Sequence, residues 1–256
     1  MSQVMITFIY IVVFLYGITI GSFLNVCVIR YIKKEEIVKT RSHCMTCGYV
    51  LKWYDLIPVF SYLFLRGRCR KCKEKISVQY PLVEALNGIL YIIIFLANGI
   101  TVGSILYCLL TSVLIVISLI DFQTMEIPFS ANVCIFVLGV VNLCLDYTNW
   151  KLYVIGFFAV SVFLYILWLV SGGKAIGGGD VKLMAAAGFL LGWKRIVFAL
   201  IAGCILGSVI HIIRMKVAKA ERTLVMGPYL SMGIYLSILF ADIFWAWYAG
   251  GIIDRL

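Results

Sequence analysis

The chain has 256 residues, of which 63% are hydrophobic and only 13% charged, and its mean hydropathy is +1.05. An average soluble domain carries roughly 25% charged residues, so this composition excludes an ordinary soluble protein and indicates an integral membrane protein. The net charge of +10 does not indicate a nucleic-acid partner, because the basic cytoplasmic loops of a membrane protein produce the same balance.

Uncharged apolar runs near the bilayer-spanning length of about 20 residues recur along the chain, whereas the period-two alternation of an outer-membrane barrel does not. We therefore expect an all-α fold, a polytopic helical bundle of about eight transmembrane helices in a lipid bilayer. Residues 1–29 carry no charge, and the first charged residue, Arg30, follows this apolar run, which is the wrong polarity for a signal peptide. This segment, from about Val4 to Ile29, is predicted to be the first transmembrane helix.

The composition changes between Arg30 and Tyr80, a stretch that holds twelve of the 22 Lys and Arg residues and four of the nine cysteines. Because Lys and Arg prefer the cytoplasmic side, this stretch is predicted to be a cytoplasmic insert, with the N-terminus of the chain outside. The predicted organisation has three parts: a first transmembrane helix at 1–29, a Cys-rich insert at 30–80 and a seven-helix membrane domain at 81–256.

Seven further apolar segments follow the insert, at about 82–98, 102–120, 127–145, 152–171, 181–193, 196–213 and 228–250. The resulting topology places the C-terminus outside. It also puts most basic residues of the connections in the cytoplasm, namely Lys174, Lys182, Arg214, Lys216, Lys219 and Arg222, and leaves Lys151, Lys194, Arg195 and Arg255 outside. The segment 181–193 is the shortest, at about 20 Å, and its small residues Ala185, Ala186, Ala187 and Gly188 would let neighbouring helices approach closely.

Two CxxC pairs lie in the insert, CMTC at 44–47 and CRKC at 69–72, separated by 21 residues. Two thiolates three positions apart can occupy two corners of a tetrahedron, so Cys44, Cys47, Cys69 and Cys72 are predicted to bind a structural zinc ion in a zinc-ribbon-like module. Disulfides are the competing interpretation, but a reducing cytoplasm favours metal. His43, beside the first pair, is expected to be a bystander.

Carboxylates at membrane depth are costly and are functional candidates for that reason. Asp121 ends one apolar segment and Asp180 begins another, and the topology places both at the cytoplasmic membrane face. Two carboxylates that share a site do not both ionise easily, so one keeps a proton while the other accepts one, which equips the pair to activate water. Glu84 is a secondary candidate, and Asp242 is expected to be structural.

Three glycines, Gly177, Gly178 and Gly179, precede Asp180. In the simplest interpretation they end one helix and the aspartate caps the next. Beside a second carboxylate, they would instead leave room for the backbone of a substrate to approach.

The chain resembles the type IV prepilin peptidases in an ordered set of motifs. These are GSFLNVCVIR at 21–30, the two CxxC pairs, YPLVE at 80–84, DFQTMEIP at 121–128 and GGGDVKLMAAAG at 177–188. The resemblance covers nearly the whole chain. One departure is Phe129, where the family often has Asp directly after the IP pair.

The resemblance implies an aspartyl protease of the bacterial inner membrane that removes the short basic leader of prepilins and pseudopilins on the cytoplasmic side. Asp121 and Asp180 match the two catalytic aspartates. It also implies N-methylation of the new N-terminal residue from S-adenosylmethionine, because the chain has the cysteine-bearing insert that relatives with cleavage alone lack. The residues themselves contain no Rossmann-like glycine fingerprint for this donor.

Two other functions fit the same residues. A transporter could couple proton flow to paired carboxylates, but it predicts carboxylates near the bilayer midplane and two related halves. A membrane scaffold without enzymatic activity could use the cysteine insert to bind a partner protein.

Overall fold

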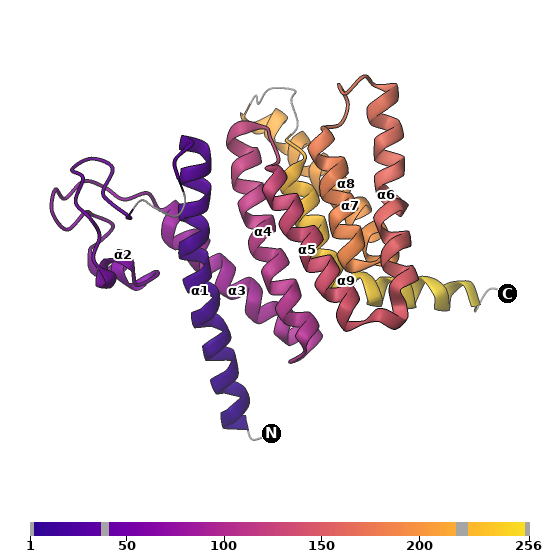
Figure 1. The fold of residues 1–256 in the computed structure, drawn as a ribbon, viewed down its shortest axis with the longest axis horizontal. Helices are drawn as coiled ribbons and strands as arrows, with labels where there is room; N and C mark the ends of the chain where they lie inside the picture. Colours follow the sequence, from indigo (N-terminus) through magenta and orange to yellow (C-terminus); the bar gives the residue numbers. More distant parts are fainter. Residues whose placement is uncertain (1–2, 37–40, 219–224, 254–256) are drawn as a thin grey trace. The chain divides into compact units, whose positions relative to one another are not determined.

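The computed structural model describes residues 3–36, 41–218 and 225–253, most of them in α-helices (Figure 1). Within these ranges there are no strands, only two isolated bridges, between His43 and Val50 and between Arg68 and Lys75. The predicted all-α class is confirmed. The elements in chain order are α1 (Gln3–Lys33), η1 (Trp53–Leu56), α2 (Phe60–Phe64), α3 (Gln79–Asn98), α4 (Val102–Thr124), α5 (Phe129–Leu145), η2 (Tyr147–Asn149), α6 (Trp150–Val170), α7 (Gly178–Leu191), α8 (Trp193–Ala218) and α9 (Gly227–Ile253).

Six of the described helices are long and apolar enough to cross a membrane, and α5 and α7, with 17 and 14 residues, are shorter. The eight segments predicted from the sequence correspond one to one with α1 and with α3 to α9. Many large apolar side chains of these helices are exposed, as lipid contact requires, among them Phe8, Phe158 and Ile243. Lys219, Arg222 and Arg255, which the topology prediction counts, lie outside the described residues.

The chain divides into two compact units, Met1–Ser104 and Ile105–Leu256. The first contains α1, the Cys-rich insert and α3, and the second contains most of α4 and all of α5 to α9. In the first unit α1 packs closely on α3. The two backbones come so near at Gly17 and Gly88 that a Cβ added at Gly17 would lie only 2.7 Å from the Cα of Gly88. The division into 1–29, 30–80 and 81–256 remains a prediction.

The core of the second unit is built around α7, which packs against α5, α6, α8 and α9. Nine of its residues are buried, from Asp180 to Leu191, including the predicted run of three alanines and Gly188. With 14 residues α7 is too short to cross a membrane comfortably by itself, and the neighbouring helices enclose it instead of lipid. The predicted close approach of a neighbouring helix to these small residues is confirmed. At Gly188 the backbone of α6 comes so near that an added Cβ would overlap the carbonyl of Gly156.

The end of α4 and the starts of α5, α7 and α9 meet at one end of this unit. Asp121, near the end of α4, contacts Gly227 at the start of α9. Ile127, just before α5, contacts Gly179 at the start of α7. Because successive long helices run in opposite directions, every second helix begins at this end, and the candidate catalytic residues lie there.

Candidate active site and metal centre

Asp121 lies in the last turn of α4 and is buried, with 5% exposure. Its Oδ2 accepts a hydrogen bond of 2.9 Å from the backbone N–H of Gly227, the first residue of α9. A Cβ on residue 227 would overlap this carboxylate, so only glycine allows the contact. The N-terminus of α9 thus stabilises negative charge on Asp121 with both a hydrogen bond and its helix dipole.

Asp180 lies in the first turn of α7 and is 7% exposed. Its Oδ2 accepts a hydrogen bond of 3.2 Å from the backbone N–H of Gly177, the residue that caps this helix. The N-cap is therefore Gly177 and not the aspartate that the sequence suggested; Asp180 is the third residue of the helix and bonds back to the cap residue. This contact alone does not require burial, because such carboxylates are usually exposed.

The two carboxylates lie at the same end of the unit, where α4 ends and α7 begins. Asp121 lies near enough to Asp180 for their negative charges to repel one another. Apart from the two backbone N–H groups, neither carboxylate has a hydrogen-bond partner among the described residues. The structure thus brings the two predicted aspartates together, and Oδ1 of each forms no hydrogen bond with a described residue.

Of the three glycines before Asp180, one precedes α7 and two begin it. Gly177 has extended backbone and precedes the helix, and Gly178 is its first residue. A Cβ at Gly179 would lie 3.0 Å from the Cβ of Ile127, so this glycine allows the segment before α5 to approach α7. That the glycines leave room for the backbone of a substrate stays a prediction.

Asp242, which the sequence analysis regarded as structural, lies in α9 away from this pair. Its Oδ2 forms an ion pair of 2.6 Å with Nη2 of Arg195 in α8. The guanidinium of Arg195 also binds the hydroxyl of Tyr107 and lies 5.3 Å from the centre of that ring. These contacts join α4, α8 and α9.

Glu84 belongs to the first compact unit, whereas both aspartates belong to the second. Its Oε2 accepts a hydrogen bond of 2.7 Å from the backbone N–H of Val59. Val59 has a φ of 62°, which is strained for a β-branched residue, and it precedes α2. Glu84 therefore holds the insert against α3, and the close approach of α1 at Gly21, whose Cβ would lie 2.8 Å from the Cα of Glu84, completes its burial.

The four cysteines of the insert converge on one point. Their Sγ atoms all lie within 4.8 Å of one another, and those of Cys44 and Cys72 are 3.8 Å apart. Four thiolates at about 2.3 Å from a zinc ion have sulfurs about 3.8 Å apart, so this set fits tetrahedral zinc. The ring of His43 lies near the carbonyl of Arg41 instead, at 3.1 Å, and His43 is not among the four clustered residues.

The two CxxC segments have the same backbone design. Cys44 N–H bonds the carbonyl of Tyr49, and Cys69 N–H bonds that of Glu74, each at 2.8 Å. The residue after each second cysteine, Gly48 and Lys73, has a positive φ. Backbone N–H groups of residues 47 and 46 bind the Cys44 sulfur and lower the pKa of that thiol to about 6. The N–H of Glu74 also binds Cys72, but burial and the hydrogen bonds to the other three thiols raise the pKa of Cys72. One proton shared within the cluster gives way when a metal ion binds the thiolates.

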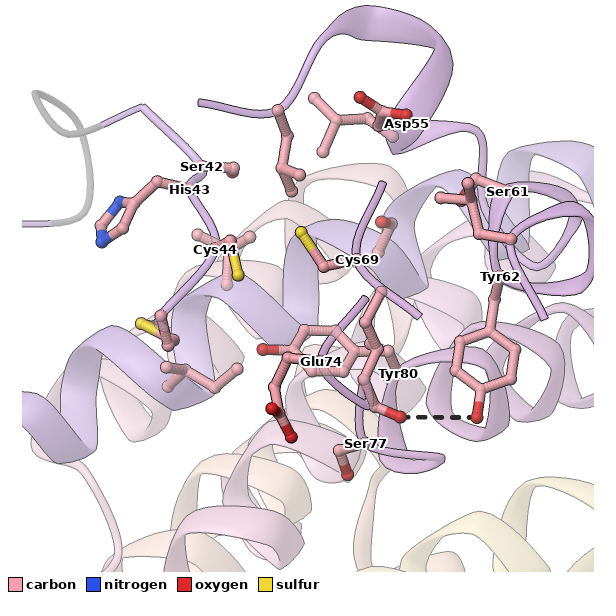
Figure 2. A pocket seen from close by; sticks show the side chains of 18 of the residues that line it. Ser42, His43, Cys44, Asp55, Ser61, Tyr62, Cys69, Glu74, Ser77 and Tyr80 are labelled. Atoms are coloured by element: carbon pink, nitrogen blue, oxygen red, sulfur yellow. Dashed lines mark hydrogen bonds between the residues drawn. The ribbon is translucent and has the colours of Figure 1, made fainter. Parts of the chain in front are cut away.

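A cavity of about 380 Å³ lies beside this cluster in the first unit. Figure 2 shows Cys44 and Cys69 at its wall, with Tyr62 and Tyr80 on another side. The hydroxyl of Tyr62 donates to the carbonyl of Ile76 at 3.5 Å. The cavity was not anticipated, because its walls come from α1, the insert and α3, and only the folded chain brings them together.

Comparisons with known proteins divide the chain in the same way as its two compact units. The family model described as Bacterial Peptidase A24 N-terminal domain matches residues 15–98, and that of the Type IV leader peptidase family matches residues 108–212. One match falls within each compact unit, and the second contains both buried aspartates. No solved structure matches the chain.

Three relatives have the same name, prepilin leader peptidase/N-methyltransferase. The chain is 36% identical to that of Myxococcus xanthus, over 78% of the chain and 61% of the relative's length. It is 30% identical to that of Aeromonas salmonicida over 94% of both chains. The relative from Bacillus subtilis is 29% identical over 90% of this chain and 94% of its own length.

The cysteine geometry predicts about one zinc ion per chain in the purified protein. Replacing one ligand, as in Cys44→Ser or Cys69→Ser, should reduce zinc to well below one per chain and destabilise the insert, because three thiolates hold the metal less tightly. Plasma mass spectrometry on protein quantified by amino-acid analysis measures this ratio. The matched control is Cys134→Ser, a cysteine in α5 outside the cluster, which should keep the full metal content. A folded wild-type protein without zinc would contradict the assignment.

Proposed function

This chain belongs to the type IV leader peptidase family, and from this premise we propose that it cleaves the leader peptide of prepilins or pseudopilins at the cytoplasmic face of the bacterial inner membrane. The observation that carries the proposal is the pair of buried aspartates, Asp121 and Asp180, in the unit that matches the leader peptidase model. The protein is a multi-pass membrane protein, so a substrate anchored in the same bilayer can reach the pair by lateral diffusion.

The substrate enters with its apolar N-terminal helix in the bilayer and its basic leader in the cytosol. The scissile bond then lies near the cytoplasmic membrane face, at the level where α7 and α9 begin. The extended backbone of the substrate needs space close to the aspartates. Gly178 leaves such space, because a Cβ there would meet only Nε1 of Trp168, at 3.9 Å, whereas the positions at Gly179 and Gly227 are already filled by Ile127 and Asp121.

The two aspartates divide the acid and base roles. One carboxylate removes a proton from water, and the resulting hydroxide attacks the carbonyl carbon of the scissile peptide bond. The other, protonated carboxyl donates its proton to the carbonyl oxygen. When the carbon–nitrogen bond breaks, the leaving nitrogen takes a proton, and the pair returns to one shared proton.

Backbone N–H groups orient the pair for these steps. Gly227 N–H binds Oδ2 of Asp121, and Gly177 N–H binds Oδ2 of Asp180. Each bond fixes one oxygen and leaves the other to bind water or the substrate carbonyl. Because both donors belong to the starts of helices, the site tolerates one full negative charge in otherwise apolar surroundings.

We further propose that the chain methylates the new N-terminal residue, as the name of its relatives implies. S-adenosylmethionine supplies the methyl group when it is bound. The cavity of the first unit is the candidate donor site, because its volume of about 380 Å³ lies in the range of small-molecule sites. The carboxylates of Glu84 and Glu74 line it and suit a cationic sulfonium, and Tyr62 and Tyr80 offer aromatic surfaces. Asp55 in the lining is already paired with Arg70, and Arg30 and Lys75 also line the cavity and suit the carboxylate of the donor.

The orientation of the chain is part of the proposal. Residues 30–80 and the connection between α8 and α9 face the cytoplasm, and both termini lie outside, because this arrangement leaves few basic residues on the external side. The transporter and scaffold alternatives are not favoured, since the aspartates lie at helix ends and the family is one of proteases.

Asp121→Asn and Asp180→Asn should each abolish leader cleavage, because an amide neither accepts nor donates the required proton. Expression and zinc content should stay near the wild-type values, since asparagine preserves size and polarity. Cleavage of a purified prepilin is followed by mass spectrometry, which also detects deamidation of the new asparagine back to aspartate. Asp242→Asn is the matched control and should retain most activity, because Asp242 pairs with Arg195 instead. Substantial cleavage by the Asp180→Asn protein would leave Asp180 as a helix cap only.

Ser61→Trp should weaken binding of S-adenosylhomocysteine by about tenfold or more, because Ser61 lines the cavity and the indole would occupy it. Isothermal titration calorimetry measures the affinity. Leader cleavage should be unchanged, since this serine lies in the other compact unit. Ser208→Trp in α8, outside the cavity, controls for the effect of a new tryptophan. Undiminished binding by folded Ser61→Trp protein would move the donor site elsewhere.

A further inference from the structure

A buried carboxamide near the start of α5 has no partner within the described protein. Asn132 is 5% exposed, and neither its Nδ2 nor its Oδ1 forms a hydrogen bond with any residue that the structure describes. Buried polar side chains are nearly always hydrogen-bonded, because an unpaired one keeps the full cost of losing its water. A buried amide whose Nδ2 and Oδ1 both lack a partner is explained if a ligand forms hydrogen bonds with these atoms.

The side of α5 that carries Asn132 packs against α7. The buried residues of α5 are Ala131, Asn132, Ile135 and Gly139. A Cβ at Gly139 would lie 3.3 Å from the backbone nitrogen of Leu190 in α7. Asn132 precedes Gly139 by seven residues, which is about two helical turns, so both lie on the face turned to α7.

A contact at the start of α5 and α7 shows which residues of α7 lie beside Asn132. Ile127, two residues before α5, contacts Gly179 in the first turn of α7. Since later residues of α5 also meet later residues of α7, the two helices run in the same direction with their starts level. Asn132 therefore lies within about one turn, 5.4 Å along the axis, of Asp180.

A second unpartnered group lies in α9, the helix whose start binds Asp121. Ser231 in α9 is 4% exposed, and its Oγ has no partner among the described residues. It is one turn beyond Gly227, whose N–H binds Asp121. Among the described residues of the second unit, the buried side-chain atoms without a partner are thus confined to Asn132 and Ser231, both close to the aspartates.

We propose that Asn132 binds the main-chain peptide group of the substrate next to the scissile bond. This inference rests on the proposed leader cleavage and adds a substrate-binding residue to it. A carboxamide has donors on Nδ2 and an acceptor at Oδ1, so it complements the C=O and N–H of an extended peptide. Both Nδ2 and Oδ1 are unpaired, and a peptide group can satisfy both, whereas a carboxylate accepts from Nδ2 only.

Binding to the main chain has a consequence for specificity. The contact recognises an unpaired backbone, which an extended peptide offers and a helix does not, since helical peptide groups already bond each other. Asn132 therefore selects substrates whose chain is unwound at the cleavage point. This requirement is independent of the side chains of the leader.

Asn132→Leu is the direct test, because leucine has nearly the same volume and no polar atoms. Cleavage of a synthetic prepilin peptide should fall roughly 10- to 100-fold in kcat/KM, since the substrate loses a buried hydrogen-bond partner. The melting temperature should stay equal or rise, because the free protein loses no hydrogen bond and removes an unpaired polar group. Asn132→Ala, which adds no bulk, should also reduce cleavage.

Asn142 on the same helix supplies a matched control. Its Nδ2 donates to the carbonyl of Leu190 in α7 at 3.1 Å, so this asparagine already has a structural partner. Asn142→Leu should therefore lower the melting temperature and leave kcat/KM near the wild-type value. The two substitutions should act in opposite ways on stability and on cleavage.

Substrates with one peptide bond replaced by an ester identify the partner group. An ester lacks the N–H, so replacement at the contacted peptide group should reduce wild-type kcat/KM roughly tenfold. The Asn132→Leu protein should cleave the ester and the peptide substrates equally well, because it makes no bond to either. Esters at the peptide groups on each side of the scissile bond are compared in turn.

Three results would overturn the inference. Wild-type kcat/KM in Asn132→Leu would show that the amide does not contact the substrate. A lower melting temperature in Asn132→Leu would show a partner within the protein, and an ester effect of equal size in the variant and wild-type proteins would assign the contact to another residue. A wild-type protein that cleaves no prepilin would instead overturn the proposed function, and this assignment with it.

Discussion

Two carboxylates that repel one another inside an apolar helix bundle are the constraint on which the second unit depends. Asp121 and Asp180 are both buried, and isolated charges in such surroundings are costly. The bundle offsets that cost with backbone N–H groups from helix starts at Gly227 and Gly177. These contacts need helices that begin at the same end of the unit, and the alternation of helix direction from α4 to α9 provides them.

In the first unit, backbone N–H groups likewise hold functional groups in place, here the cysteine cluster and Glu84. In each CxxC segment the first cysteine donates its N–H to a carbonyl five residues later, and the carboxylate of Glu84 binds the N–H of the strained Val59. Close packing of α1 on α3, which Gly17 and Gly88 allow, positions Glu84 for that contact. The two family models divide at the same place as the two compact units, and the one described as the leader peptidase family covers the unit that holds both aspartates.

The sequence predicted the helices and the cysteine cluster well, because both depend on local patterns: apolar runs of spanning length and paired thiolates at fixed spacing. It also pointed to Asp121 and Asp180, since charged residues are rare in such runs. It did not indicate that Gly227 binds Asp121, because these residues are 106 positions apart and only tertiary packing joins them. Asn132 was missed because the search considered ionisable side chains alone, whereas an uncharged amide in an apolar helix is a comparable signal.

The pH dependence of leader cleavage tests most directly whether the two aspartates act as one pair that shares a proton. The wild-type protein in lipid nanodiscs is given a prepilin peptide, and kcat/KM is measured across the pH range in which the protein stays folded. The account predicts a bell-shaped profile: acid protonates the carboxylate that activates water, and alkali removes the proton that the other carboxyl donates. A rate that rises with pH to a plateau and does not fall again would show that no protonated carboxyl is needed, and would contradict the shared-proton mechanism.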